Sequence, residues 1–356
     1  METTTFDQDY DNDTDDPSML VALCSHDGDN KLGAQISVLY YFLFIVSLFG
    51  NGLVLVIIHR FERLSTVTNI LLLNLVLSSL FFTSSLPFQS VYMQLSNWIF
   101  GTVMCKIVNS VYYLGFYSSV FFLTLLTFDR HLAVVYSLAA SQARNQRYAV
   151  ISCVVVWIVS GLACIRPMLL HNTYVYTDDA LYCDEYPGLL PYIDVELLRK
   201  SGFYLQLLLF LILPLAVIIY CYVRIAITVI SSRIATKFRT VRLIFIIVLL
   251  FFICWTPFNI VMLMVLMNDE GISCEEEQNL GYALQITRNI AHLYFCISPI
   301  FYTFVGKKFQ NYFRQLLVKH FPGLKKYISV TEPKRTNMST KSTRNELFDG
   351  KQTEEL

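Results

Sequence analysis

The chain has few charged residues and lacks the motifs of an enzyme. Charged residues make up only 15% of the 356 positions, whereas hydrophobic residues make up 55%, a balance that is uncommon in water-soluble domains. We find no nucleophile elbow, no phosphate-binding loop and no run of His and Cys at metal-ligand spacing. The sequence therefore gives no support to an enzyme, and we expect no cofactor, no metal and no nucleic-acid partner.

Basic residues are missing from the first 30 positions, which carry nine acidic residues and no Lys or Arg. A basic start followed by an apolar core is also missing there, so we expect no cleavable signal peptide. Because the formal net charge of the whole chain is zero, its total says nothing about partners. The separation of charge along the chain is informative instead, since it reports on membrane topology.

Long uncharged runs are what the sequence has in abundance. From Ile107 to Phe128 there are 22 residues without a charge, followed at once by Asp129-Arg130-His131. A helix of this length rises about 33 Å, enough to cross a hydrocarbon core of roughly 30 Å. Cys105 stands at the other end of the run and suits an oxidising exterior. The run therefore predicts a spanning helix with Cys105 outside and Asp129-Arg130 inside.

Seven stretches qualify as membrane spans. They are residues 36–59, 67–92, 105–134, 148–171, 201–230, 241–267 and 280–304. Basic residues gather in the loops after spans one, three, five and seven, so the positive-inside rule places the N-terminus outside the cell and the C-terminus in the cytoplasm. We find no internal repeat, so the inverted-repeat plan of many transporters has no support.

The predicted fold is an all-α membrane protein, a seven-transmembrane helix bundle with an amphipathic cytoplasmic helix after span seven. Its parts are an acidic extracellular segment (1–35), the bundle (36–304), the amphipathic helix (305–321) and a disordered cytoplasmic tail (322–356). The lipid bilayer is thus the first expected partner, and the plasma membrane is the expected location.

Several motifs recur in the order and spacing of a known superfamily. They are Gly50-Asn51, Asp129-Arg130-His131, Trp157, Pro214 with Tyr222, Cys254-Trp255-Thr256-Pro257 and Ser298-Pro299-Ile300-Phe301-Tyr302. With these motifs the chain resembles a rhodopsin-like (class A) G-protein-coupled receptor. Three narrower motifs, Ser85-Leu86-Pro87, Trp98-Ile99-Phe100-Gly101 and Phe304-Val305-Gly306-Lys307-Lys308-Phe309, resemble those of chemokine receptors. The stretch Tyr282–Ala291 looks most like the XC-type (lymphotactin) receptor.

The resemblance implies two disulfides at the outer face. The family pairs the top of span three with the second outer loop, here Cys105 with Cys183, and the N-terminal segment with the start of span seven, here Cys24 with Cys274. The alternative is that these four are free thiols. The other five cysteines lie inside apolar runs, where we expect them to act as small hydrophobic residues.

The resemblance also implies a ligand, a small basic chemokine, for which an acidic outer face is the electrostatic complement. Asp9, Tyr10 and Asp11 would recruit it, with Tyr10 as a candidate sulfation site and Asn12 as a candidate glycosylation site. Asp184 and Glu185 in the second outer loop extend the acidic field. By the family's pattern, the pocket within the bundle is lined by Tyr40, Gln89, Tyr112, Tyr113, Phe258, Arg288 and His292. Each aromatic could instead be ordinary packing, and His292 could be a hydrogen-bonded bundle histidine.

Arg288 is the unusual member of this set, because many relatives in the family have Glu there. A cation inside a span costs about 2.5–3.5 kcal/mol on insertion scales, so Arg288 is expected to face a wet cavity or an anionic partner. The alternative is a packing Arg whose side chain reaches outward to the membrane interface.

Signalling, by the same resemblance, uses a set of switch residues. They are Asp129, Arg130, Tyr222, Trp255, Pro257, Pro299 and Tyr302. Pro257 weakens the helical hydrogen bonds of span six and lets its inner half move. The expected partners are a heterotrimeric G protein of the inhibitory class, driving chemotaxis and calcium signalling, and arrestin and receptor kinases, which would act on the tail.

Two positions depart from the superfamily pattern and leave alternatives open. Ser79 stands where an Asp is usual and Ser298 where an Asn is usual, and both positions belong to the family's sodium pocket. We therefore expect sodium not to modulate this chain. The departures favour an atypical receptor that scavenges chemokine without G-protein coupling, whereas the retained Asp129-Arg130 argues against it. A transporter or channel is the other alternative, and it would need acidic residues within the spans.

Overall fold

The computed structural model describes residues 31–61, 66–136, 145–175, 180–185, 194–232, 238–267, 273–305 and 307–323. The chain divides into two compact units, residues 1–313 and residues 314–356. The first unit contains all the helices of the bundle and the strands, so the architecture below is that of this unit.

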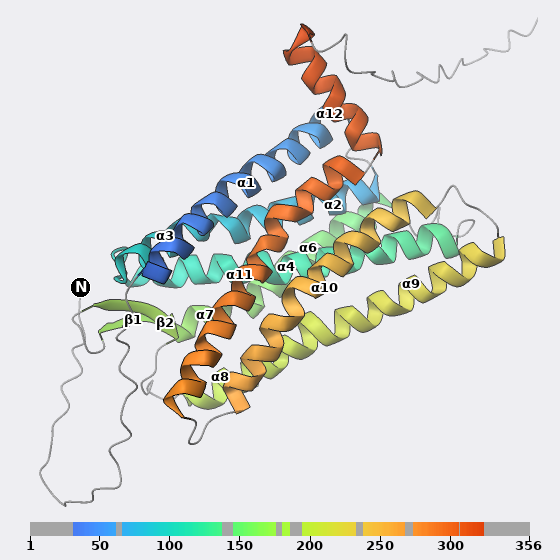
Figure 1. Ribbon diagram of the computed structural model, residues 1–356. Coiled ribbons are helices and arrows are strands. Elements are labelled where there is room, and N and C mark those ends of the chain that lie inside the picture. The colour runs from blue at the N-terminus through green and yellow to red at the C-terminus, as the bar shows by residue number, and fades with distance from the viewer. Residues whose placement is uncertain are drawn as a thin grey trace, which may run out of the picture. The chain divides into compact units, whose positions relative to one another are not determined.

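The first unit is a bundle of long helices, shown in Figure 1. In chain order they are α1 (Lys31–Phe61), α2 (Val67–Ser84), α3 (Leu86–Leu95), α4 (Gly101–Val135), α6 (Gln146–Ala163), α7 (Ile165–Leu170), α8 (Val195–Leu207), the π-helical turn η1 (Leu208–Ile212), α9 (Leu213–Ser232), α10 (Phe238–Met267) and α11 (Cys274–Val305). Within the described residues, six stretches are long and apolar enough to cross a membrane. They are Gln35–Phe61, Val67–Leu95, Gly101–Val135, Gln146–Leu170, Leu197–Ser231 and Ile244–Met267.

Helix α11 is the seventh member of the bundle. It has 32 residues and packs against α10 and α1, but Gln285, Arg288, Asn289 and His292 make its N-terminal half more polar than the other six stretches. A spanning helix that carries polar residues turns them toward the bundle interior. The all-α membrane fold predicted from the sequence is therefore confirmed.

Three of the predicted spans are interrupted, which the sequence analysis did not foresee. Span two divides into α2 and α3 at Ser85, two residues before Pro87, and span four divides into α6 and α7 at Cys164, three residues before Pro167. Span five contains η1 shortly before Pro214. Proline has no backbone N–H and its ring crowds the preceding turn, so the hydrogen-bond ladder is rearranged just upstream of each proline.

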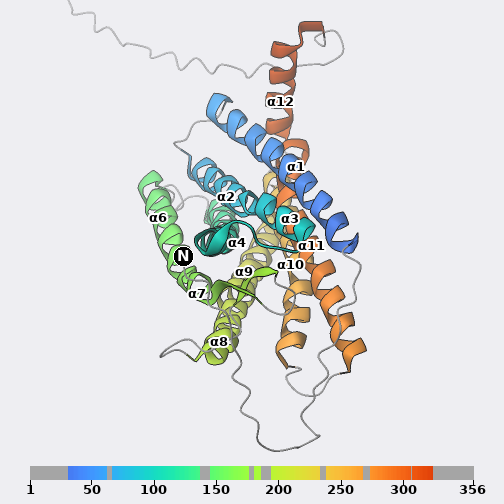
Figure 2. The same cartoon turned by 90° about the vertical axis from the view of Figure 1, so that its left-hand side faces the viewer.

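A β-hairpin was also not predicted. Strands β1 (His171–Val175) and β2 (Leu181–Glu185) pair in antiparallel register, with Thr173 opposite Cys183. The hairpin follows α7 directly and packs against α4, as Figure 2 shows. We missed it because each strand has only five residues and the polar loop between the apolar spans carries no clear alternation.

The backbones of helices α2 and α4 approach one another closely at Gly115 and Phe82. A side-chain carbon added at Gly115 would lie 2.3 Å from the backbone nitrogen of Phe82 and 2.7 Å from its Cα. Small residues allow the backbones of spanning helices to approach one another in this way. Beside this crossing, the Phe82 ring stacks on Phe295 with centroids 3.8 Å apart, and the Phe116 ring stacks on Trp255 at 4.1 Å.

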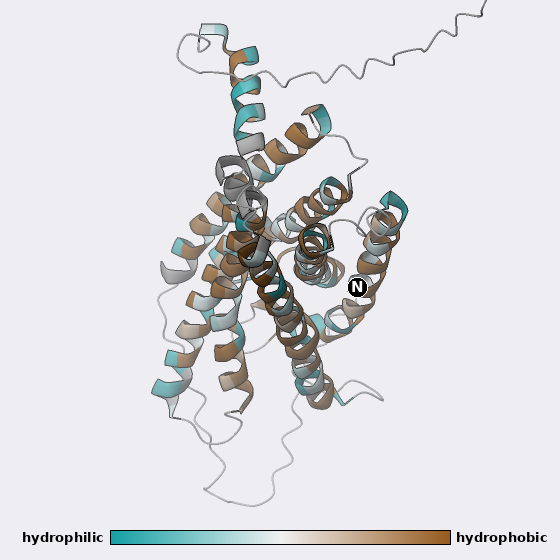
Figure 3. Ribbon diagram, turned by 90° about the vertical axis from the view of Figure 1, so that its right-hand side faces the viewer, coloured by the Kyte–Doolittle hydropathy of each residue, from teal (hydrophilic) through white to brown (hydrophobic). Residues whose placement is uncertain are grey.

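The bundle is apolar along its outer faces as well as its core. Figure 3 shows brown, hydrophobic residues around most of the bundle helices. Many large apolar side chains point away from the bundle, including Phe49, Ile158, Leu162 and Ile230, which are all more than half exposed. A helix that is hydrophobic all round is the form that a lipid environment requires.

The helix predicted at residues 305–321 is present as α12 (Lys307–His320). Within the first unit, its Tyr312 ring stacks on Phe61 at the end of α1, with centroids 4.8 Å apart. The location of α12 along the inner membrane surface stays a prediction, as do the boundaries of the acidic N-terminal segment and the tail.

The crossing of α2 and α4 generates a testable prediction. Gly115→Ala forces a methyl group into the backbone of α2, and overpacking of this kind costs about 1–3 kcal/mol. We expect the purified protein to unfold at a lower temperature. Gly161→Ala is the matched control, since nothing lies within 4 Å of a side-chain carbon added there. Equal thermal stability of the two variants would contradict the proposed contact.

Candidate functional site

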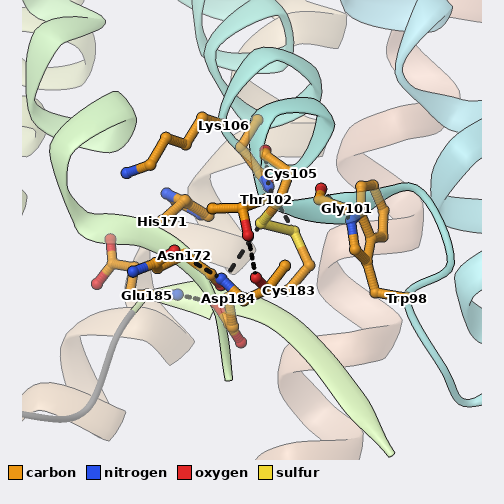
Figure 4. The surroundings of a disulfide bond; sticks show 12 residues. Trp98, Gly101, Thr102, Cys105, Lys106, His171, Asn172, Cys183, Asp184 and Glu185 are labelled. Atoms are coloured by element: carbon orange, nitrogen blue, oxygen red, sulfur yellow. Dashed lines mark hydrogen bonds between the residues drawn. A yellow bond between two sulfur atoms is a disulfide. The ribbon is translucent and has the colours of Figure 1, made fainter. Parts of the chain in front are cut away.

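A disulfide closes one end of the bundle. Cys105 near the start of α4 is bonded to Cys183 on β2, 78 residues later, as Figure 4 shows. This confirms the pairing of Cys105 with Cys183 that the sequence predicted. In the second predicted pair, Cys24 and the side chain of Cys274 lie outside the described residues. We call this end of the bundle the disulfide end.

Hydrogen bonds fix the hairpin to α4 around the disulfide (Figure 4). The hydroxyl groups of Thr102 and Thr173 bond to one another, and Lys106 Nζ donates to the carbonyl oxygen of Met168 at 3.1 Å. Asn109 Nδ2 lies 3.4 Å from the Sγ atom of Cys183 on β2. The base of the hairpin is therefore held in one position over the helix ends.

His171 begins the hairpin and is buried. Its Nδ1 lies 2.8 Å from the carbonyl oxygen of Pro167, and because a carbonyl can only accept, Nδ1 carries the proton. Burial holds the pKa of His171 below its ordinary value, so the ring is neutral at pH 7. A neutral ring adds no charge to the hairpin.

Below the hairpin lies a cavity of about 130 Å³. Its lining comes from α4, α7, β2, α8 and α10. The lining residues are Tyr112, Tyr113, Phe116, Arg166, Glu185, Arg199, Phe203, Gln206, Trp255, Phe258, Met262, Val265 and Leu266. Typical small-molecule sites measure roughly 300–1,000 Å³, so this cavity has room for one small group of a ligand.

One wall of the cavity is charged. Glu185 accepts from two guanidinium groups, with Arg166 Nη2 at 3.2 Å and Arg199 Nε at 3.0 Å. Arg166 Nε also donates to the Leu198 carbonyl oxygen at 3.4 Å, and it fits there because Gly202 has no side chain. The cluster ties β2 to the ends of α7 and α8 and brings a single carboxylate to the cavity.

Trp255 forms the floor of the cavity. It is 1% exposed, stacks on Phe116, and meets Phe258, Phe295 and Phe82 edge-on. Pro257 follows two residues later within α10. A group that enters the cavity thus touches a ring that is packed into the core of the bundle.

Beside the cavity, polar and aromatic residues of α1, α4 and α11 form a second cluster. The His292 ring, fully buried, lies with Nε2 3.4 Å from the Tyr112 hydroxyl and with its centroid 5.1 Å from that of Tyr40. Gln285 Nε2 donates to the Tyr40 hydroxyl at 3.5 Å. Arg288 is half-buried, one turn before His292 on the same face of α11.

The sequence-predicted pocket residues are only partly brought together. Tyr112, Tyr113, Glu185 and Phe258 line the cavity, and Tyr40, Arg288 and His292 lie beside it. Gln89 on α3 and the exposed Asp184 are not among the lining residues. Asp9, Tyr10, Asp11 and Asn12 lie outside the described residues, as do the side chains of Pro299 and Tyr302.

Sequence reasoning missed Arg166, Arg199 and Gln206. A usable signal was present for Arg166, because it stands inside the apolar run of span four, where a cation needs a partner. Arg199 was also visible as a basic residue in a loop on the expected outer side. Gln206 carries no such signal, since a single amide in a span is common packing.

The opposite end of the bundle holds the charged pair Asp129 and Arg130. Arg130 Nη2 lies 2.8 Å from Asp129 Oδ2, and the Thr68 hydroxyl of α2 donates to the same oxygen at 2.9 Å. Asp129 is 4% exposed. The Tyr222 ring on α9 meets Phe245 of α10 edge-on, with centroids 5.0 Å apart. We call this end of the bundle the Arg130 end.

Between the two ends, the polar interior is built from serines. The Ser118 hydroxyl donates to Ser78 Oγ at 2.8 Å, and Ser79 donates to the Leu75 carbonyl oxygen at 3.1 Å. Ser298 is buried on α11. The hydroxyl groups of Ser78, Ser79 and Ser118 are hydrogen-bonded within the protein, and none of these serines brings a negative charge.

Comparisons with known proteins agree with this architecture. The family profile described as 7 transmembrane receptor (rhodopsin family) matches residues 50–302. The chain is 36% identical to C-C chemokine receptor type 1 of Homo sapiens over 357 residues, covering 96% of this chain and 98% of that relative. It is 37% identical to C-C chemokine receptor type 3 of Cavia porcellus, covering 83% of each.

A third relative is G-protein coupled receptor E1 of Equine herpesvirus 2, which is 35% identical over 87% of this chain and 81% of that protein. None of these three carries an XC-type name, so they do not support the finer likeness expected from Tyr282–Ala291. The chain therefore belongs to the rhodopsin family of seven-transmembrane receptors and, within it, to the chemokine receptors, which are multi-pass membrane receptors and not enzymes.

Proposed function

We propose that this receptor binds a small basic chemokine at the cell surface and activates a heterotrimeric G protein of the inhibitory class. The observation that carries the proposal is the cavity at the disulfide end, whose floor is Trp255. The family membership supports the same function. The disulfide end would face the outside of the cell and the Arg130 end the cytoplasm, in accord with the basic inner loops.

Recognition would occur in two steps. The acidic N-terminal segment, with Asp9, Asp11 and a sulfated Tyr10, attracts the basic body of the chemokine. Asn12 would carry a glycan on the same outer side. The ligand's N-terminal end then enters the bundle mouth and places one group in the cavity, because the cavity has no room for more.

Activation would be a shift between two packings of the bundle. A group pressing on Trp255 favours one arrangement of the rings around Phe116 and Phe82, and α10 transmits the change because Pro257 weakens its hydrogen-bond ladder. At the other end, Arg130 leaves Asp129 and turns toward Tyr222, with Pro299 and Tyr302 completing the change. The opened end would receive the G protein, and receptor kinases and arrestin would act on the tail.

A second candidate is a scavenging receptor that internalises chemokine without G-protein coupling. Ser79 and Ser298, which are buried and bring no carboxylate to the middle of the bundle, favour it. The Asp129–Arg130 pair, held by Thr68, favours signalling. Both candidates bind chemokine, so they differ in whether binding activates a G protein.

One experiment tests the proposal and separates the candidates. Cells expressing the receptor are exposed to a panel of CC, CXC and XC chemokines, and both binding and suppression of cyclic AMP are recorded. We expect at least one chemokine to bind and to suppress cyclic AMP. Binding with internalisation but no suppression would select the scavenger, and no binding by any member would overturn the proposal. The XC members test the expectation from Tyr282–Ala291.

The disulfides should differ in their importance. Cys105→Ala frees the hairpin that carries Glu185, and the loss of a native disulfide costs about 2–5 kcal/mol. We expect it to abolish surface expression or ligand binding, measured by flow cytometry. Cys24→Ala should weaken binding with little loss of expression, because the predicted Cys24–Cys274 bond would only shape the rim. Any other pairing in non-reduced peptides would contradict this.

Sodium should not act as a negative modulator of agonist binding. Ser79 donates its hydroxyl to the Leu75 carbonyl oxygen, and neither Ser79 nor Ser298 supplies a carboxylate to hold a cation. Agonist competition curves at matched ionic strength, with sodium exchanged for N-methyl-D-glucamine, are expected to superimpose. A sodium-specific shift to higher agonist concentration would show that another group binds the ion. Ser79→Asp is the matched variant, in which we expect sodium sensitivity to appear.

A further inference from the structure

We infer that the cavity below the hairpin receives an anionic group, a carboxylate above all, and that Arg288 is the cation that selects it. This inference deepens the proposed function, because it names the chemistry of the ligand group that reaches Trp255. The body of the proposed chemokine is basic, whereas the group that enters the cavity would be anionic.

The polar groups that line the cavity are mostly hydrogen-bond donors. Among the lining residues, Glu185 is the only one with a carboxylate, and Arg166 and Arg199 both bond to it. The remaining polar groups can all donate. Gln206 accepts from the Tyr117 hydroxyl through Oε1, which leaves its amide N–H groups as donors, and the Tyr113 hydroxyl can donate as well. The Tyr112 hydroxyl bonds to His292. A cavity rich in donors suits an acceptor.

Arg288 adds a positive charge beside these donors. Its side chain is half-buried in the N-terminal half of α11, and it forms no hydrogen bond or ion pair with any residue that the structure describes. Long side chains of a helix lean toward the helix N-terminus, which for α11 is the disulfide end. Arg288 lies one turn before His292 on α11, and His292 Nε2 is 3.4 Å from the hydroxyl group of the lining residue Tyr112.

The donors and the cation together favour an anionic occupant. A half-buried guanidinium group within a membrane-spanning helix favours an anion, and the carboxylate of the cavity lining is already shared by two other guanidinium groups. His292, the nearest ring on the same face of α11, is hydrogen-bonded to Tyr112 and is not an anion. A carboxylate of the ligand would meet Arg288, and the donors Tyr113 and Gln206 could bond its oxygens.

The experiment uses the purified full-length receptor in nanodiscs and three small probes of nearly equal shape. The probes are phenylacetate, phenylacetamide and phenethylamine, whose ring suits the aromatic walls and whose polar end is anionic, neutral or cationic. Dissociation constants are measured by ligand-observed NMR. We expect phenylacetate to bind roughly ten- to hundredfold more tightly than phenylacetamide, because hydrogen bonds between charged groups are stronger than those between neutral groups. Phenethylamine should bind most weakly.

Two variants locate the cation. Arg288→Gln should remove the preference for phenylacetate, whereas Arg288→Lys should keep part of it, because Lys retains the charge but loses the planar fork. Arg224→Gln is the matched control, since Arg224 is exposed on α9 and is not a lining residue. Equal binding of phenylacetate and phenylacetamide by the unaltered receptor, or tighter binding of phenethylamine, would overturn the inference whatever the variants do.

The source of the anion is tested with the chemokine that the panel identifies. Replacing acidic residues near its N-terminus by their amides should lower signalling potency in the unaltered receptor but not in Arg288→Gln. If phenylacetate binds as expected and no such replacement matters, the anion is a free small carboxylate. Because the probes require no chemokine, failure of the probe experiment and failure of the panel remain distinguishable.

Discussion

The exclusion of water from the bundle is the constraint on which the rest of the structure depends. In lipid, each polar group has to find its partner within the protein. The hydroxyl groups of Ser79, Thr83, Ser90, Thr124 and Thr127 each donate to the carbonyl oxygen four residues earlier in their own helix. Such bonds keep polar side chains inside spanning helices without help from another helix.

The same constraint decides where charge can stand. Asp129 is kept at the Arg130 end by Arg130 and Thr68, and Glu185 is kept at the cavity wall by two arginines. Between the ends, the described interior is mainly aliphatic and aromatic, and its buried polar residues, such as Ser79, Asn51 and Asn259, are uncharged. A membrane receptor organised in this way has two sites of strong electrostatics joined by a packed, neutral core. A change at one site therefore has to reach the other through shifts of packed side chains and helices, since close-packed interiors transmit displacement well.

The sequence predicted the large features because hydrophobic length and loop charge are read directly from it. Seven spans, the helix after them and the Cys105–Cys183 bond all came from patterns or from resemblance. The breaks at Ser85 and Cys164 were not predicted, because a proline permits several local rearrangements of the backbone and only tertiary packing selects one.

The cavity was predicted less well than the bundle. Tyr112, Tyr113, Glu185 and Phe258 were named by family pattern, but Arg166 and Arg199 were not, because their contact with Glu185 joins segments up to 19 residues apart through a hairpin that the sequence did not reveal. Gln89 was also named by the family pattern, but it is not a lining residue of the cavity. A charged residue inside a span was the one physical signal that would have improved the assignment.

The π-helical turn η1 determines how the cavity-lining face of α8 is oriented relative to the buried face of α9. Arg199, Phe203 and Gln206 on α8 share one face, which lines the cavity, whereas Ile218, Ile225 and Val229 on α9 share the face that is buried near the Arg130 end. The extra residue in the turn sets the phase between these faces, since each residue of an α-helix turns it by about 100°. Insertion or deletion of a single residue in η1 would rotate α8 relative to α9. The cavity-lining face, and with it ligand specificity, could then change while the face near the Arg130 end stays the same.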